Sequence, residues 1–307
     1  MGSGGSVRWA FRCGAWTPSR SEWLLAARCV QREEKDRIGQ FVFAKDAKSA
    51  MAGRLLLRRL VSEKMEIPWS EVRLERSPRG KPYLATPFKV CSDSDPDPCA
   101  WSFNISHQGE YAVLAAEQGL QVGVDVMKTT MSGSNSVSDF FRIMTRQFTD
   151  YEWSVIQSAS SERQQLSMFY RHWTLKESYI KAIGTGLGFN LQRAEFHLST
   201  EPLMPGYTLR QTKMLLDEEE QEDWIFEESL LDTDHHVAVA LGPAACRPVP
   251  SSLALPSTFL LLSFSDLMEL ASPLTEEDAA FWDNFKTKAE APQRQRETHP
   301  CPDNCPF

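Results

Sequence analysis

The chain has 307 residues, 42% hydrophobic and 24% charged, which is enough for one large or two ordinary globular domains. Its net charge of -8 excludes non-specific nucleic-acid binding, which needs an excess of Lys and Arg, so an anionic ligand must meet a local basic patch. No window reaches the roughly 18 consecutive apolar residues of a membrane helix. We therefore expect neither a nucleic acid nor a membrane as a partner.

Seven cysteines are scattered along the chain, with no CxxC motif and no zinc-type spacing. This usage predicts a reduced compartment, and we expect the cytosol. A disulfide or metal clip between Cys301 and Cys305 stays open. Three arginines precede the first acidic residue, as in a transit peptide, but the alternation at residues 7–11 favours a strand instead.

An N-terminal half, residues 1–128, is predicted to place helices before strands. Helical periodicity covers residues 19–30, 33–45 and 46–65, with Asp46 as the cap of the long third helix. Short β-type runs, separated by turns that contain Gly and Pro, follow at residues 72–75, 101–106, 111–117 and 122–127.

The long helix carries a basic face. Arg54 and Arg58 are spaced i,i+4, and Arg59 and Lys64 keep that end positive. A solvated surface explains this pattern, and so does a docking site for an acidic partner.

A C-terminal half, residues 129–242, repeats the plan of helices before strands. Helices are predicted at residues 139–147, at a capping box on residues 149–152, and at residues 161–183, where Gly184 ends the helix. Strands are predicted at residues 192–198, 207–216, 224–229 and 235–241. The counterpart strands 111–115 and 236–240 indicate a pseudo-duplicated α+β protein. Residues 243–307 read as a partly ordered tail without chemistry.

The helix at 161–183 has a carboxylate in its apolar stripe. Leu166, Phe169, Trp173, Glu177 and Ile180 share one face, since they are spaced by three and four residues. A buried carboxylate needs a compensating partner. Lys181, one turn further along the helix, could be this partner through an ordinary i,i+4 ion pair. The alternative is that the carboxylate belongs to a functional site.

A second carboxylate lies on the predicted strand 122–127. Val122, Val124 and Val126 share one face, and Asp125 points to the other. Asp125 either caps a turn or, together with Glu177, holds a shared divalent cation. Magnesium prefers one or two carboxylates, waters and phosphate oxygens, so this pair is suited to a magnesium-bound diphosphate.

A donor-rich loop and a strand end complete the set of candidate residues. Arg76, Arg79 and Lys81 surround Gly80, a pattern that suits a phosphate monoester and equally a charged surface turn. Ser106 and His107, at the end of a strand, can donate to the same group.

These clusters together resemble the ordered motifs of the Sfp-type 4'-phosphopantetheinyl transferases, and the animal members most closely. The motifs are Arg76-Ser77-Pro78-Arg79-Gly80-Lys81-Pro82, Phe103-Asn104-Ile105-Ser106-His107-Gln108-Gly109, Val122-Gly123-Val124-Asp125-Val126 and Trp173-Thr174-Leu175-Lys176-Glu177. The resemblance runs from about Val7 to Leu241. It implies two similar α/β halves, related by a pseudo-twofold axis, with the active site between them.

The resemblance implies a reaction with coenzyme A. The 4'-phosphopantetheine arm is transferred to a serine of an apo carrier domain, and 3',5'-ADP leaves. The coenzyme would contact Arg37, Arg76, Ser77, Pro78, Arg79, Gly80, Lys81, Asn104, Ile105, Ser106, His107, Asp125 and Lys181. Arg37 enters this set by resemblance alone.

Catalytic and metal roles follow from the same resemblance. Glu177 is expected to be the base, with Lys181 and His107 supplying positive charge; whether Glu177 or a metal-bound water takes the serine proton stays open. Mg²⁺ is expected on Asp125 and Glu177. The family commonly has a second acid where this chain has Met127, and a thioether is a poor ligand for a hard cation, so Gln108 is the predicted third contact.

The expected partners are coenzyme A and acidic apo acyl carrier domains. They include those of fatty acid synthase, the mitochondrial acyl carrier protein, and the aminoadipate-semialdehyde and formyltetrahydrofolate dehydrogenases. The carrier would dock on the face at Arg54, Arg58 and Arg59 or on residues 140–146. A monomer is expected, because two related halves build the site within one chain. The alternatives are a catalytically silent adaptor that binds coenzyme A or a carrier, and a structural protein whose charges are all surface charges.

Overall fold

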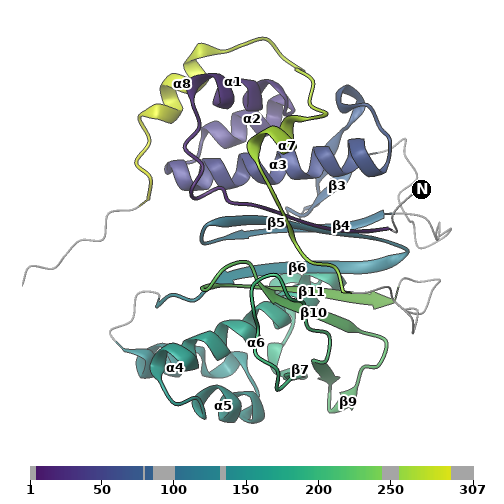
Figure 1. Cartoon of the computed structure of the whole chain (residues 1–307), viewed down its shortest axis with the longest axis vertical. Coiled ribbons are helices and arrows are strands. Elements are labelled where there is room, and N and C mark those ends of the chain that lie inside the picture. Colours follow the sequence, from purple (N-terminus) through teal and green to yellow (C-terminus); the bar gives the residue numbers. More distant parts are fainter. Residues whose placement is uncertain (1–4, 79, 86–100, 132–135, 244–255, 292–307) are drawn as a thin grey trace, which may run out of the picture.

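A computed structural model describes residues 5–78, 80–85, 101–131, 136–243 and 256–291 and confirms the α+β class. Figure 1 shows the layers in succession: a group of helices, a sheet, a second sheet, and a second group of helices. The two sheets face each other in the middle of the molecule.

The first sheet belongs to the N-terminal part of the chain, with one strand from the C-terminal part. Its strands are, in spatial order, β12 (Leu260–Leu262), β1 (Ser6–Phe11), β5 (Tyr111–Gln118) and β4 (Trp101–Gln108). β1 runs parallel to β12 and antiparallel to β5, and β4 and β5 form a hairpin. Gly109 makes the tight turn of this hairpin with a φ of 63°, a conformation that favours glycine.

Helices cover the outer face of the first sheet (Figure 1). They are α1 (Arg20–Arg28), α2 (Arg32–Gly39), α3 (Ala44–Lys64), α7 (Phe264–Met268) and α8 (Ala279–Lys286). α3 is enclosed by the sheet and its neighbouring helices, so nearly its whole circumference is buried. It begins two residues before the predicted Asp46 cap, after Phe43, whose side chain makes no capping hydrogen bond.

The second sheet has the order β10 (Ile225–Leu230), β11 (His235–Pro243) and β6 (Leu120–Lys128), all antiparallel. The domain boundary after residue 128 stays a prediction; β6, the last strand before it, pairs with β11 in the second sheet. Apolar side chains of both sheets, including Val113 and Val124, form a common core between them.

Helices also cover the outer face of the second sheet. They are α4 (Val137–Met144), α5 (Asp150–Gln157) and α6 (Glu162–Ile183). α5 begins with the predicted capping box, and Gly184 ends α6 in the left-handed conformation, as predicted. α6 packs closely on β6 at Gly123: a Cβ there would lie 2.0 Å from the carbonyl oxygen of Ser178. Glycine therefore allows the helix that carries Glu177 to approach the strand that carries Asp125.

Two small sheets complete the fold. A hairpin consists of β2 (Leu74–Arg76) and β3 (Pro82–Leu84), and a three-stranded sheet consists of β7 (Ala194–His197), β8 (Lys213–Leu216) and β9 (Glu219–Glu220). The strand predicted over 207–216 is confined to its last four residues, and the other predicted strands of the second half agree within about two residues.

The described part of the predicted tail, residues 256–291, packs against the N-terminal part of the chain. β12 pairs with β1, and the ring of Trp23 in α1 stacks on Phe281 and Phe285 of α8, with centroid distances of 5.7 and 3.8 Å. Cys13 and Cys29 are buried free thiols, while the pair Cys301 and Cys305 lies outside the described residues. In the described parts of the chain, no helix has both the length and the apolar character needed to span a membrane.

Candidate active site

A cavity of about 770 Å³ opens between the two groups of elements and takes its lining from both. The predicted residues that line it are Arg37, Arg76, Gly80, Lys81, Asn104, Ile105, Ser106, His107, Glu177 and Lys181. They come from α2, the β2–β3 turn, β4 and α6, so segments more than a hundred residues apart in sequence meet in one place.

Four predicted residues do not line this cavity. Asp125 accepts hydrogen bonds from Ser106 and Lys181, which do line the cavity. Ser77 and Pro78 belong to the β2–β3 turn, where Ser77 Oγ accepts from the backbone N–H of Lys81 and shapes the loop. The Gln108 side-chain oxygen accepts from the backbone N–H of Lys128 at 2.6 Å, and its assignment as a metal contact stays a prediction. Arg79 lies outside the described residues.

Lys181, Asp125 and Ser106 form a hydrogen-bonded group at the wall of the cavity. Lys181 Nζ donates to Asp125 Oδ1 at 2.6 Å and to Ser106 Oγ at 2.9 Å, and Ser106 Oγ donates to Asp125 Oδ1 at 2.9 Å. The predicted i,i+4 pair of Lys181 with Glu177 is therefore wrong. The close packing of α6 on β6 offers Lys181 a buried carboxylate, which is a stronger partner than a half-buried one.

Glu177 is half-buried in the cavity, and its carboxyl has a raised pKa. Burial is the main cause, the negative charge of Asp125 adds to it, and Lys181 opposes both. Leu166, Phe169 and Ile180 of the same stripe are buried, as predicted. Glu177 interrupts this stripe where the helix faces the cavity, so its side chain lines the cavity and not the core.

His107 lines the cavity, and several charged side chains act on it. Desolvation is the largest cause that lowers its pKa; the charges of Lys181, Arg37 and Arg54 lower it further, while Asp46 raises it. The imidazole is therefore neutral near pH 7 in the empty cavity. A bound anion would offset the surrounding positive charge and favour the protonated form.

The β2–β3 turn presents Arg76 and Lys81 to the cavity. Gly80 takes a φ of 80° at the tip, and the Ser77 backbone N–H donates to the carbonyl oxygen of Lys81. Arg76 forms an ion pair with Glu34 through Nε at 2.9 Å and Nη2 at 3.0 Å. The turn is thus tied to α2 through Arg76, and the guanidinium of Arg76 is held in place.

The carboxylates fit a magnesium ion. Among the described residues, no cluster of three or more His, Cys, Asp or Glu side chains could hold a metal. Magnesium needs fewer protein ligands, because it keeps waters and takes oxygens from substrate phosphates. Asp125 Oδ2 is buried and has no hydrogen-bond partner, which leaves a hard oxygen donor close to Glu177.

The predicted docking face on α3 is wrong, because Arg54 and Arg58 are 4% and 1% exposed. Arg58 donates to the backbone carbonyls of Trp69 and Val72, and Arg54 lines the cavity. Arg59 pairs with Glu63 and Glu269. Their i,i+4 spacing places Arg54 and Arg58 on one face of the helix, but it does not show that other elements cover that face.

Several residues that line the cavity are not among those predicted from the sequence. Besides Arg54, the loop after α6 lines the cavity with Gly184, Gly186 and Phe189. Gly184 and Gly186 are separated by one residue and both take a positive φ, and glycines at this spacing were a signal in the sequence of an irregular loop. Glu34, buried beside Arg76, gave no signal, since its neighbours in sequence are also charged.

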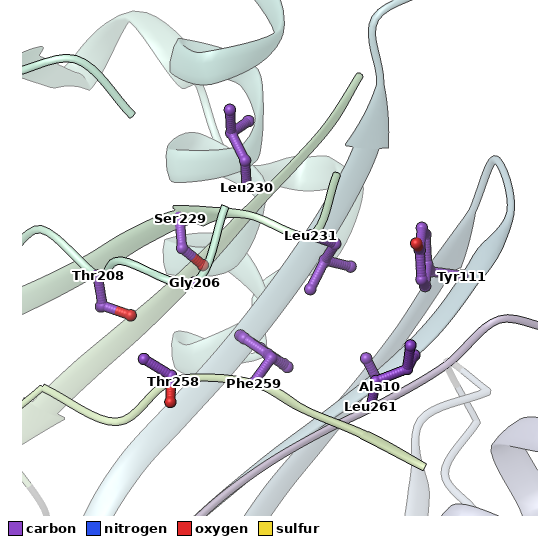
Figure 2. A pocket seen from close by; sticks show the side chains of 10 residues that line it. All are labelled: Ala10, Tyr111, Gly206, Thr208, Ser229, Leu230, Leu231, Thr258, Phe259 and Leu261. Carbon is purple, nitrogen blue, oxygen red and sulfur yellow. The ribbon is translucent and has the colours of Figure 1, made fainter. Parts of the chain in front are cut away.

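A second cavity, of about 80 Å³, lies away from this cluster, beneath the C-terminal segment. Figure 2 shows Thr258 and Phe259 of that segment facing Thr208, Ser229 and Tyr111. None of the predicted site residues lines it.

Comparisons with known proteins agree with this geometry. Residues 14–119 match the family described as 4'-phosphopantetheinyl transferase, N-terminal, and residues 121–240 match the 4'-phosphopantetheinyl transferase superfamily. The boundary between the two matches falls at Leu120, the first residue of β6.

Curated relatives match over nearly the whole chain. The L-aminoadipate-semialdehyde dehydrogenase-phosphopantetheinyl transferase of Xenopus laevis is 55% identical over 296 residues, 95% of each chain. The protein of the same name from Homo sapiens is 55% identical over 294 residues, 94% of this chain and 93% of its own. A phosphopantetheinyl transferase of Thraustochytrium is 37% identical over 238 residues, 76% of this chain and 77% of its own. The chain belongs to the 4'-phosphopantetheinyl transferase superfamily and is an enzyme of the transferase class.

Proposed function

We propose that this enzyme transfers the 4'-phosphopantetheine arm of coenzyme A to a serine of an apo carrier domain and releases 3',5'-ADP. The observation that carries the proposal is the convergence of Glu177, Lys181 and His107 with an arginine-rich wall in one cavity. Coenzyme A bears a diphosphate and a ribose phosphate, and such a cavity offers charge to both. The family membership and the names of the relatives support the same reaction.

In the proposed reaction, the serine oxygen of the carrier attacks the phosphorus that bears the pantetheine arm, and the bond to 3',5'-ADP breaks. Glu177 takes the proton of the serine hydroxyl, a role that its raised pKa suits. Lys181, held by Asp125 and Ser106, places a positive charge beside the reacting diphosphate. His107, which lines the same cavity, provides a further hydrogen-bond donor.

We propose Mg²⁺ as the metal, held by Asp125 and Glu177. When bound, it would neutralise charge that develops on the diphosphate. The buried and unpartnered Asp125 Oδ2 supports this assignment.

The arginine-rich wall is proposed to bind the ribose phosphate of coenzyme A. Arg37, Arg76 and Lys81 line this part of the cavity, and His107 connects it with the reacting end. Guanidinium groups suit a phosphate monoester, because they donate in a planar fork.

The pseudo-twofold relation of two α/β halves is also part of the proposal. Each sheet carries helices on its outer face, and the cavity takes residues from both layers, which supports a site at the junction (Figure 1).

The carrier domain is proposed to dock on residues 140–146, since the alternative face on α3 is buried. Arg142 and Ile143 of α4 are exposed, and Arg146 follows in the 3-10 turn η2 (Thr145–Gln147). Gln147, at the end of that turn, lines the cavity, so a carrier on this surface would present its serine to the site.

The names of the relatives suggest a carrier domain of an aminoadipate-semialdehyde dehydrogenase as one partner. We extend the proposal to the carriers of fatty acid synthase, the mitochondrial acyl carrier protein and formyltetrahydrofolate dehydrogenase. A monomer in the cytosol is the proposed working form. The buried free thiols of Cys13 and Cys29 agree with a reducing compartment.

The test is the intact mass of an apo carrier after incubation with the protein, coenzyme A and magnesium. A gain of one phosphopantetheine arm is expected, which a chelator or Glu177→Gln abolishes. Glu201→Gln, at an exposed glutamate outside the cavity, should keep the gain. If none of several carriers gains mass although the protein binds coenzyme A tightly, the proposed transfer reaction is wrong. The hypothesis of a catalytically silent adaptor would then remain.

A further inference from the structure

Glu34 is a buried carboxylate that three arginines from three different elements share. It lies on α2 and is 6% exposed. Arg76 pairs with it through two hydrogen bonds, Arg54 Nη1 lies 3.6 Å from Oε1, and Arg37 Nη1 lies 3.8 Å from Oε2. The arginines come from α2, α3 and the end of β2, and all three line the large cavity.

Arg54 is the most deeply placed of the three. It is 4% exposed, and its Nη1 is buried with no hydrogen-bond partner. A buried guanidinium donor without a partner is unfavourable, so its persistence beside a cavity points to a ligand that completes it. The ion pair with Glu34 is too long to serve as a hydrogen bond.

Arg76 is oriented by Glu34. Its Nε and Nη2 donate to the carboxylate, and its Nη1 donates to the carbonyl oxygen of Gly80 at 3.1 Å. Three of the five N–H groups of this guanidinium are then in use. The side chain is held from two sides, and its remaining donors are available to a ligand in the cavity.

The charge balance of the cluster also favours an anion. The arginines lower the pKa of Glu34 although burial raises it, so the carboxylate stays ionised. Burial lowers the pKa of Arg54 to about 10, which keeps it protonated near pH 7. One carboxylate among three guanidiniums leaves two positive charges, which match the charge of a phosphate monoester dianion.

We propose that Glu34 is a positioning residue for the ribose phosphate of coenzyme A and that Arg54 is an additional direct contact to that phosphate. This inference rests on the proposed function, because it assumes that coenzyme A occupies the cavity. Without Glu34, three like charges would repel one another and Arg76 would lose its fixed orientation. Glu34 therefore determines how strongly the enzyme distinguishes a nucleotide with the ribose phosphate from one without it.

The test is calorimetric binding of two nucleotides, 3',5'-ADP and 5'-AMP, which differ by the ribose phosphate and need no carrier. The wild type should prefer 3',5'-ADP. Glu34→Gln and Arg54→Lys should each weaken 3',5'-ADP binding by about tenfold and change 5'-AMP binding less than twofold. Glu33→Gln, next to Glu34 and exposed in a pair with Arg73, is the matched control and should keep the preference.

The outcomes separate this inference from the reaction itself. A wild type that binds neither nucleotide overturns the proposed function, and the inference with it. Three outcomes would overturn the inference alone. They are equally weakened binding of both nucleotides in the variants, an unchanged preference for 3',5'-ADP in both variants, and a wild type that binds both nucleotides equally well. Thermal unfolding of each variant controls for misfolding, and Arg54→Lys, which keeps the charge, decides the question if Glu34→Gln does not fold.

Discussion

Lys181 and Asp125 form a 2.6 Å ion pair that joins helix α6 to strand β6 at the wall of the cavity. The pair uses Asp125 Oδ1 and leaves Oδ2 buried without a partner. The ammonium group of Lys181 therefore neutralises Asp125 through one oxygen, and the other oxygen is the one that we propose for magnesium.

Replacement of this lysine should impair transfer more than folding. Lys181→Met removes the positive charge beside the diphosphate and leaves Asp125 with Ser106 alone, so we expect kcat to fall by roughly 10²-fold. Lys213→Met, which breaks an exposed pair with Glu220, is the control. Steady-state transfer to an apo carrier measures both, and near-wild-type kcat in Lys181→Met would remove Lys181 from the reaction.

Glu177→Gln should stabilise the metal-free protein while it abolishes transfer. Burial and the charge of Asp125 raise the pKa of Glu177, so the native state binds more protons than the unfolded chain between the ordinary and the raised pKa. The stability of the wild type should therefore fall relative to Glu177→Gln as pH rises through that window. In chelator, we expect the variant to melt roughly 2 °C higher near pH 7, with the two curves converging near pH 4. A variant that melts lower at neutral pH would contradict this explanation.

Lys176, in the same helix, should affect stability more strongly than Lys181, because its ion pair is fully buried whereas the Lys181 side chain is 29% exposed. It is fully buried and pairs with Glu152 at 2.8 Å, while it also donates to the carbonyl oxygens of Leu191 and Ala194. Lys176→Met leaves a buried carboxylate unpaired, which should lower the free energy of unfolding by about 3–5 kcal/mol.

Denaturant unfolding of Lys176→Met and Lys181→Met measures this contrast. Adding Glu152→Gln to Lys176→Met should recover part of the loss, because the neutral amide needs no counterion. Equal stabilities of the two lysine variants would show that the buried pair does not hold α6 in place.

Gly123→Ala should separate the two carboxylates. The added Cβ would lie 2.4 Å from the backbone nitrogen of Ala182 and 2.0 Å from the carbonyl oxygen of Ser178, so α6 must move away from β6. We expect a loss of about 1–3 kcal/mol in stability and a larger relative loss of transfer, since Glu177 and Lys181 move with the helix. Gly188→Ala meets no atom within 4 Å and is the control. Full activity in Gly123→Ala would show that the helix spacing does not set the site.

The sequence predicts those parts of this molecule that local patterns determine. The capping box at Thr149, the end of α6 at Gly184 and the alternation of β6 around Asp125 depend on residues within a few positions of one another. The α+β class follows from them.

What the sequence cannot predict depends on elements that are distant in sequence. Arg54 has the spacing of a surface residue, and only the packing of the sheet, α1 and α2 around α3 makes it part of a cavity. Lys181 has a carboxylate one turn away, but β6 offers a better one. In both cases the sequence allows several oppositely charged partners for one side chain, and the tertiary packing determines which of them lies close to it.

The position of α8 constrains the order in which this protein can fold on the ribosome. The core beside Trp23 is completed by Leu262, Leu267, Phe281 and Phe285, all near the end of the chain. All elements of the second sheet and its covering helices lie within residues 120–243 and are synthesised before these four side chains. The N-terminal part of the chain is therefore synthesised first, but its core is complete only after α8 has been synthesised. Until then, the apolar surface beside Trp23 is exposed during translation and must be protected from aggregation.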